Sequence, residues 1–183
     1  MSKYIINFQR CLSSGMCPAG VTSFKTGSPA CTPQDWDVWT DILLSEHIWS
    51  FRGVDLQYHK ELQIKLAQWG LLVAEEYATA VFNELPEDQS ISSGIMIIRN
   101  LLSHGEVVNV DKTLKAISDV KYKVKTSGAI MAERATYATI KLFLSKNFRD
   151  VLKYAESIAL RAEQLELDTT VMSQKLSEII NSD

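Results

Sequence analysis

Long apolar runs are absent from this sequence. No segment reaches the roughly 18 to 20 consecutive apolar residues that a membrane-spanning helix needs, so we expect no contact with a membrane. Near the start, the unbroken apolar run Tyr4-Ile5-Ile6 is too short for the core of a signal peptide. We therefore expect a protein of the cytoplasm.

Cysteine is scarce as well. Its three copies, Cys11, Cys17 and Cys31, all lie within the first 31 residues. Three is an odd number, which does not suit a disulfide framework, and the spacings of six and fourteen residues fit no standard zinc pattern. A zinc site with a fourth ligand such as His47 is the alternative, although we expect His47 and His59 at the surface. Free thiols are typical of a reducing cytoplasm, and we predict neither a metal nor a cofactor.

An excess of basic charge is missing too. The chain has 19 Lys and Arg against 22 Asp and Glu, which gives a formal net charge of -3 at pH 7. Proteins that coat nucleic acid or anionic membranes by charge alone need a basic surface, so this class is excluded. The densest basic run, Lys121, Lys123 and Lys125, alternates along the chain and does not share one helix face. The acidic pairs Glu75-Glu76 and Glu87-Asp88 are interpreted as solvated acids, because adjacent residues do not share a helix face either.

What the sequence does have is a helical apolar pattern. Its 183 residues suit one core of ordinary size, and a hydrophobic fraction of 46% is typical of globular proteins. Residues 1–31 hold three of the eight glycines and show little periodicity, so we predict an irregular N-terminal arm. Residues 32–183 carry apolar residues at steps of three and four. The sequence therefore predicts an all-α fold, a bundle domain of five or six helices that follows the arm.

Capping and terminating residues set the predicted helix limits. Thr32 and Pro33 are typical of a helix start, Pro86 closes the longest pattern, and Gly105 follows the next one. A stripe of Leu62, Leu66, Trp69, Val73, Tyr77 and Ala80 marks the longest helix, in which Gly70 predicts a close approach of another helix. The expected helices cover about residues 32–45, 54–85, 90–105, 111–144 with a break or bend at Gly128, 151–165 and a short final stretch from 168. Between the helix over 90–105 and the one that starts at residue 111, Val107, Val108 and Val110 predict a short strand or a linker.

One stretch at the end of the predicted 90–105 helix carries candidate chemistry, namely Arg99-Asn100-Leu101-Leu102-Ser103-His104. RNA is cleaved without a metal when its own 2'-hydroxyl loses a proton and attacks the neighbouring phosphate. His104 is suited to that proton transfer near neutral pH, and Arg99 can hold the phosphate with two hydrogen bonds. Asn100 lies one helical turn before His104, so its amide can orient the imidazole or hold a phosphate oxygen.

This stretch resembles the signature of HEPN domains, which are helical bundles found in toxin, abortive-infection and RNA-processing proteins. That signature is an Arg, a polar residue that is often Asn, three variable positions and a His, placed near a helix end. The order of helices from about residue 33 to residue 145 is similar as well. Many members of the toxin branch carry a Tyr two residues after the His, where this chain has Glu106, so regulation through that Tyr is excluded.

The resemblance implies a metal-independent endoribonuclease with a site shared by two copies of the chain. It implies His104 as the acid-base residue, Arg99 as the phosphate clamp and Asn100 in support, with RNA as substrate. It also implies a defence or toxin–antitoxin role, with an antitoxin as protein partner. Since Arg99 and His104 are about 140° apart around a helix, one copy holds them awkwardly. Two copies across a twofold axis would bring both pairs into one cleft.

A second hypothesis belongs to another class of protein. It is a non-catalytic helical subunit of a larger nucleoprotein or viral assembly, which makes its contacts through the N-terminal arm and the C-terminal helices. In that case Arg99 is a solvated surface residue, and His104 is a cation that is favourable at a helix C-terminus. The two hypotheses predict different surroundings, because a catalytic pair must be open to RNA whereas a structural pair is covered or engaged.

Overall fold

Apolar residues at steps of three and four do form helices along nearly all of the described chain. The computed structural model describes residue 4 and residues 6–13, 30–31, 43–105 and 110–182. The helices after residue 42 are α3 (Leu44–Ser50), α4 (His59–Glu84), α5 (Ser90–His104), α6 (Val110–Val120), α7 (Ser127–Leu144), α8 (Phe148–Gln164) and α9 (Thr170–Asn181). Two 3-10 turns, η2 (Phe51–Gly53) and η3 (Leu56–Tyr58), join α3 to α4. The prediction of an all-α fold is confirmed, with seven α-helices in this part of the chain rather than five or six.

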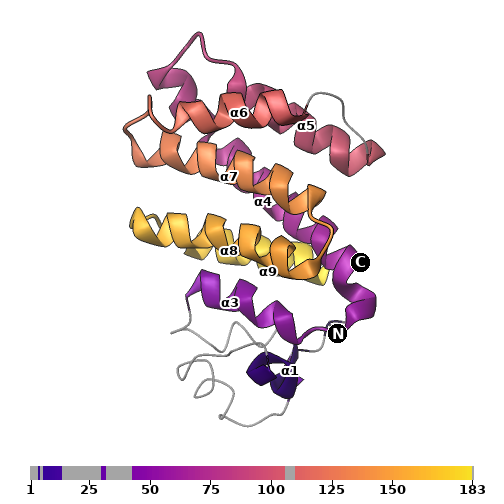
Figure 1. Ribbon diagram of the computed structural model, residues 1–183. Helices are drawn as coiled ribbons and strands as arrows, with labels where there is room; N and C mark the ends of the chain where they lie inside the picture. The colour runs from indigo at the N-terminus through magenta and orange to yellow at the C-terminus, as the bar shows by residue number, and fades with distance from the viewer. Residues whose placement is uncertain (1–3, 5, 14–29, 32–42, 106–109, 183) are drawn as a thin grey trace.

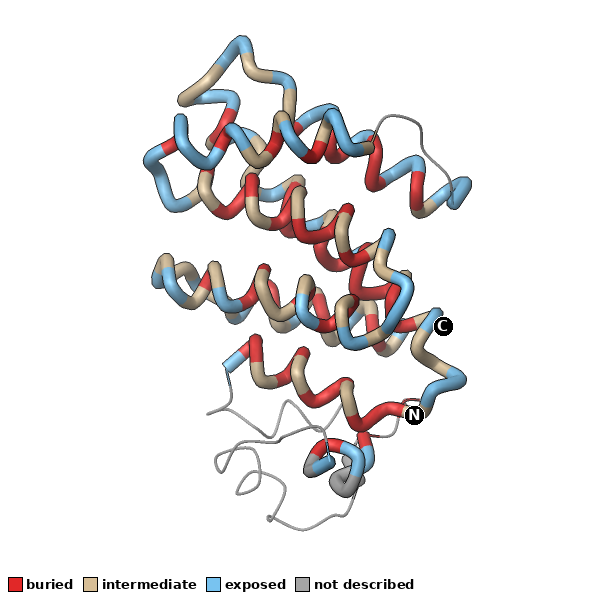
Figure 2. Tube along the Cα trace, in the orientation of Figure 1, coloured by how far each residue is buried: buried red, intermediate tan, exposed pale blue. Residues whose placement is uncertain are grey.

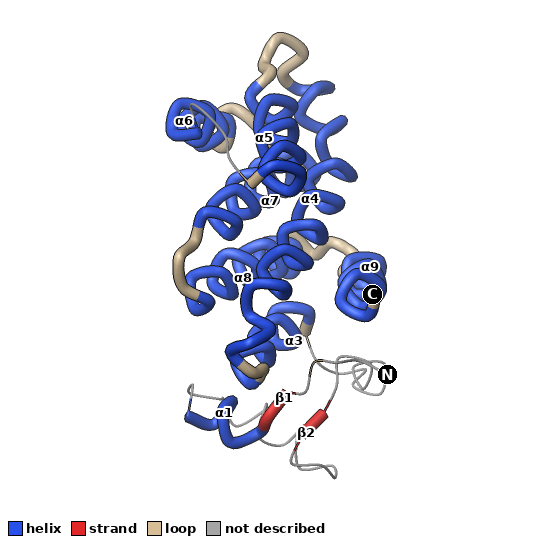
Figure 3. The backbone as a smooth tube through the Cα atoms, turned by 90° about the vertical axis from the view of Figure 1, so that its right-hand side faces the viewer, coloured by secondary structure: helices blue, strands red, loops and turns tan. Residues whose placement is uncertain are grey.

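The helices form a stack in which α5 and α6 lie at one end (Figure 1). Next come α7 and α4, which pack against each other along their lengths, then α8 and α9, and finally α3. Figure 3 shows the same order from the side, with α3 and the short N-terminal elements at the end opposite α5. The candidate stretch on α5 therefore lies at one end of the molecule and far from the N-terminal segment.

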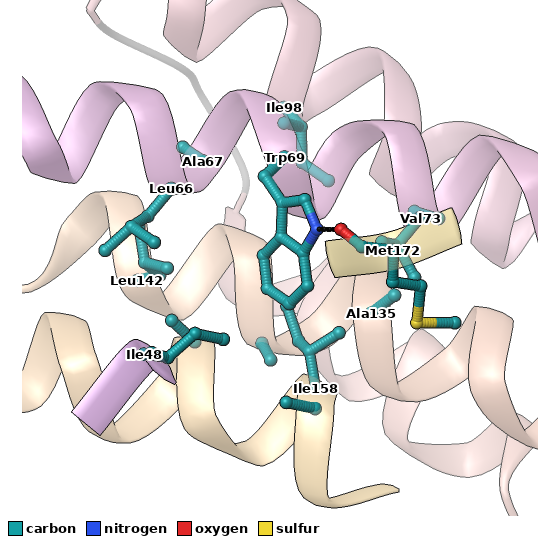
Figure 4. Close-up of a cluster of buried hydrophobic side chains, with 14 of the residues drawn as sticks. Ile48, Leu66, Ala67, Trp69, Val73, Ile98, Ala135, Leu142, Ile158 and Met172 are labelled. Atoms are coloured by element: carbon teal, nitrogen blue, oxygen red, sulfur yellow. Dashed lines mark hydrogen bonds between the residues drawn. The ribbon is translucent and has the colours of Figure 1, made fainter. Parts of the chain in front are cut away.

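The core runs through the middle of this stack, where the inward faces of α4, α7 and α8 meet (Figure 2). Trp69 of α4 is fully buried, and its indole Nε1 donates a hydrogen bond to the backbone oxygen of Met172 at 3.0 Å (Figure 4). That bond supplies the polar partner that a buried indole needs. The predicted stripe on α4 is buried at Leu62, Leu66, Trp69 and Val73, and half-buried at its C-terminal members Tyr77 and Ala80.

Small residues let α7 approach α4 and α5 closely. A Cβ atom added at Gly70 of α4 would lie 2.2 Å from Thr139 Oγ1 of α7. A Cβ atom added at Gly94 of α5 would lie 2.4 Å from Thr136 Cγ2, which also belongs to α7. Real Cβ atoms do not come that close to other heavy atoms, so each glycine is required by the packing. The close approach predicted at Gly70 is present.

Several helix limits differ from the prediction. Helix α3 runs from Leu44 to Ser50, although the first predicted helix was expected to end near Ser45. The longest helix begins at His59 rather than near residue 54, because Val54 is extended and Asp55 caps the turn η3 by accepting from the Gln57 N–H. The predicted break at Gly128 lies earlier, over residues 121–126. Thr126 caps α7, with its side chain accepting from the Ala129 N–H at 3.3 Å. Val110, predicted as strand or linker, is the first residue of α6.

Within the predicted N-terminal arm, the structure describes three short elements. The strands β1 (Ile6–Asn7) and β2 (Ala30–Cys31) pair in antiparallel fashion, and α1 (Phe8–Ser13) follows β1. Arg10 of α1 forms an ion pair of 2.9 Å with Asp55, which ties this segment to the start of α4. Most of the predicted helix over about residues 32–45 lies outside the described residues. The same is true of Cys17, Val107 and Val108. Of the helices described, none is both long and apolar enough to cross a membrane.

Candidate functional site

The candidate residues occupy the last turns of α5, and the end of this helix is well defined. Gly105 follows with a φ of 77°, a left-handed conformation that glycine adopts at little steric cost. Its N–H donates to the backbone oxygen of Leu101 at 2.9 Å. The terminator predicted from the sequence is therefore confirmed, and the backbone holds His104 in helical geometry.

Burial divides the candidate stretch into two sets of residues. Leu101 is buried and Leu102 is half-buried, whereas Arg99, Asn100 and His104 are all exposed. The core needs none of the three polar side chains.

Together with their exposed neighbours these residues form one outward surface, which we name the α5 face. Its members are Ser92, Ser93, Met96, Arg99, Asn100, Ser103 and His104. At about 100° per residue they fall within an arc of about 140° around the helix. Arg99 and His104 lie at opposite edges of that arc, whereas Asn100 lies one turn before His104 on the same side. A single copy of the chain thus brings Asn100 and His104 together and keeps Arg99 apart from them.

The α5 face has no acidic residue, and α5 as a whole contains neither Asp nor Glu. Near its centre Met96 keeps 62% of its surface exposed, so the face combines an apolar side chain with hydroxyl, amide, guanidinium and imidazole groups. Such a surface suits an anionic ligand, because no carboxylate on the same helix repels it.

Arg99 is engaged by an acid of the neighbouring helix. Its Nε and Nη2 atoms donate to the same oxygen, Oε1 of Glu75 on α4, at 3.0 and 2.8 Å. The side chains keep 61% and 31% of their surfaces exposed, so the pair contributes only about 0 to 1 kcal/mol to stability. The next residue, Glu76, binds Lys175 of α9 instead, at 2.6 Å. Sequence spacing carries no sign of the Arg99–Glu75 contact, since it depends on the packing of α4 against α5.

Metal-ligating side chains are dispersed in the described part of the chain, where no three His, Cys, Asp or Glu residues gather. Cys11 is a buried free thiol whose Sγ donates to the Ser50 oxygen at 3.4 Å, and burial raises its pKa to about 11. His47 of α3 is 5% exposed, so the expectation of a surface position was wrong for this residue. His59 is half-buried and stacks on Phe148 with ring centroids 3.7 Å apart.

No family model, curated protein or solved structure matches this chain. What the chain does is therefore inferred from the residues of the α5 face and from their contacts.

Proposed function

We propose that the chain is a metal-independent endoribonuclease of HEPN type that acts as a homodimer in the cytoplasm. The observation that carries the proposal is the exposure of Arg99, Asn100 and His104 on one acid-free helix face. The helix uses its other side to build the core and presents these three polar residues, in the signature spacing, at the surface, with Arg99 paired to Glu75. Their resemblance to the HEPN signature adds the reaction type.

The proposed reaction proceeds within the RNA strand. The His104 imidazole accepts the proton of a 2'-hydroxyl, and that oxygen attacks the adjacent phosphorus. The bond from phosphorus to the 5'-oxygen breaks, and an imidazolium returns a proton to the leaving oxygen. Arg99 donates hydrogen bonds to the phosphate oxygens as their charge grows. The products are a cyclic 2',3'-phosphate and a 5'-hydroxyl, and Asn100 orients the imidazole from one turn away.

A second copy of the chain completes the site in this proposal. Since Arg99 and His104 lie at opposite edges of the α5 face, a partner docked on that face adds a second Arg and a second His to the same cleft. Met96 at the centre of the face supplies apolar surface for the contact. A protein partner such as an antitoxin, within a defence role, belongs to the same proposal.

The experiment compares three single variants on a panel of RNAs. His104→Ala and Arg99→Ala should each lower the cleavage rate at least about 100-fold, since both groups act on the transition state. Gln174→Ala, exposed on α9, is the control outside the α5 face and should cleave like the wild type. EDTA should leave the rate unchanged, and mass spectrometry should find cyclic 2',3'-phosphate ends. Cleavage that survives both substitutions, or a wild type that cleaves no RNA of the panel, would contradict the proposal.

The second candidate function is the non-catalytic assembly subunit. One observation favours it, because the guanidinium of Arg99 already has a partner in Glu75 at 2.8 Å. In that case the motif residues are part of a helix surface, and Met96 is a contact for a neighbouring subunit. The same three variants separate the candidates, since the assembly hypothesis predicts no RNA cleavage by any of them.

A further inference from the structure

The geometry of the Arg99–Glu75 pair bears on how the proposed site takes up its substrate. Arginine holds a phosphate best with two neighbouring N–H groups, such as the edge made by Nε and Nη2. In this structure both groups of that edge donate to one carboxylate oxygen of Glu75, at 3.0 and 2.8 Å. An internal acid thus occupies the edge of the guanidinium that a phosphate would use.

Glu75 is suited to this role by its position and its neighbours. It comes from α4, not from the helix that carries the motif, and its side chain keeps 31% of its surface exposed. Because the pair is solvated, its two members separate at a cost that an incoming anion can offset. Glu76 is turned to α9 and bound by Lys175, so it does not share the contact with Arg99.

We propose that Glu75 is an internal competitor for the substrate phosphate at Arg99, an inference that rests on the proposed function. In the free chain Glu75 holds Arg99, and a phosphate of the RNA backbone must displace the carboxylate before the site can act. A tethered carboxylate is always close to the guanidinium, so it outcompetes small monovalent anions. A polyanionic strand that also contacts other groups of the α5 face can displace it. The pair therefore selects for extended RNA over isolated anions.

The test measures the equilibrium binding of a mixed-sequence, 2'-O-methylated RNA oligonucleotide, which cannot be cleaved because its 2'-oxygen carries no proton. Glu75→Gln should bind this RNA about two- to fivefold more tightly than the wild type, the size expected for loss of an exposed ion pair. Glu76→Gln is the matched control, since it removes the same charge from the adjacent residue, and its affinity should stay at the wild-type value. In cleavage assays Glu75→Gln should lower KM and leave kcat unchanged, because Glu75 acts on the free chain and not on the transition state.

A double-variant cycle separates competition from a general effect of charge. On an Arg99→Ala background, Glu75→Gln should gain no more affinity than Glu76→Gln does, because the contested guanidinium is gone. The inference is overturned if Glu75→Gln binds no tighter than Glu76→Gln, or if its gain persists without Arg99. It is also overturned if Glu75→Gln binds RNA more weakly, which would make Glu75 a residue that positions Arg99.

The same measurements distinguish the failure of this inference from the failure of the proposed function. If Arg99→Ala binds RNA as tightly as the wild type does, then Arg99 is no phosphate clamp and both ideas fall. If Arg99→Ala weakens binding while Glu75→Gln and Glu76→Gln behave alike, only the competition is refuted. Thermal unfolding of each variant supplies a further readout, since a merely structural ion pair would lower the Tm of Glu75→Gln without any gain in affinity.

Discussion

Glu133 illustrates how strongly the surroundings of a single residue control its chemistry. This acid of α7 is only 4% exposed, and desolvation raises the pKa of its carboxyl group. The positive charges of Arg134, Lys121 and Arg161 act in the opposite direction without cancelling that shift. Burial therefore makes the ionised form of Glu133 unfavourable in the folded state.

We predict that Glu133 destabilises the fold at neutral pH. Folding raises the pKa of the Glu133 carboxyl group. With respect to this group the fold is therefore most stable below the unfolded-state pKa of about 4.5, and it loses stability as the pH rises through the folded-state pKa. Glu133→Gln should thus increase the free energy of unfolding at pH 7.5 by about 1 kcal/mol, the usual size of a single substitution, and should gain less at pH 4.5. Urea unfolding at the two pH values measures this. Glu178→Gln, exposed on α9, is the control, and equal effects of the two substitutions would contradict the account.

The three motif residues differ from Glu133 in being exposed to solvent. Arg99, Asn100 and His104 are exposed and do not pack in the core, so the stability of the fold does not depend on which side chains stand there. Residue types and spacing alone make them candidates in the sequence. The same pattern gives no sign of Glu75, because the partner of Arg99 lies 24 residues earlier and on another helix. No local pattern encodes such a contact.

The helices themselves show which features of this fold are local. At the start of α5 the Asp88 carboxylate accepts from the Ser90 N–H at 2.9 Å, although Asp88 was expected to be a solvated acid. The end of α5 was predictable, because Gly105 terminates the helix directly after His104. The break between α6 and α7 was predicted too, but at Gly128 rather than over residues 121–126. It is set by the Glu84 carboxylate, which accepts hydrogen bonds from the backbone N–H groups of Lys125 and Thr126, about forty residues away. The end of α5 was predicted correctly because a local residue sets it, whereas the α6–α7 break was misplaced because a distant residue contributes to it.

At the level of the helices, the close contact between α4 and α7 leads to a stability prediction. Gly70→Ala should lower the free energy of unfolding by about 1 to 3 kcal/mol, because the new Cβ would lie 2.2 Å from Thr139 Oγ1. The gain in helix propensity of about 1 kcal/mol does not offset an overlap of that kind. Denaturant unfolding monitored by circular dichroism at 222 nm measures the change.

A second substitution shows whether the overlap is the cause. Adding Thr139→Ala removes the overlapping hydroxyl, so the double variant should lose less stability than the sum of the two single variants. Gly128→Ala provides a graded comparison, since its Cβ would meet Ala80 Cβ at 3.0 Å and should cost less. Additive losses in the double variant, or a neutral Gly70→Ala, would show that the two helices are free to separate.

At the scale of the whole molecule, the position of α5 decides what a second copy can reach. α5 and α6 lie at one end of the stack, whereas α3 and the described N-terminal elements lie at the other (Figures 1 and 3). A partner docked on the α5 face therefore leaves the contacts of the N-terminal segment in place. The bundle was predictable from apolar periodicity. Of the proposed site, only residue types and spacing were predictable, because the Arg99–Glu75 contact depends on how α4 packs against α5.

Complementation between two inactive variants tests the shared ribonuclease site most directly. Arg99→Ala and His104→Ala chains with different tags are refolded together, and the mixed dimer is purified and assayed for RNA cleavage. The mixed dimer keeps one Arg and one His, on different chains, so it should cleave at least about tenfold faster than either variant alone. A mixed dimer of Arg99→Ala with the Arg99→Ala/His104→Ala double variant lacks any Arg99 and should remain inactive. A mixed dimer of the two single variants that is as inactive as its parents, beside an active wild type, would contradict a site shared between two copies of the chain.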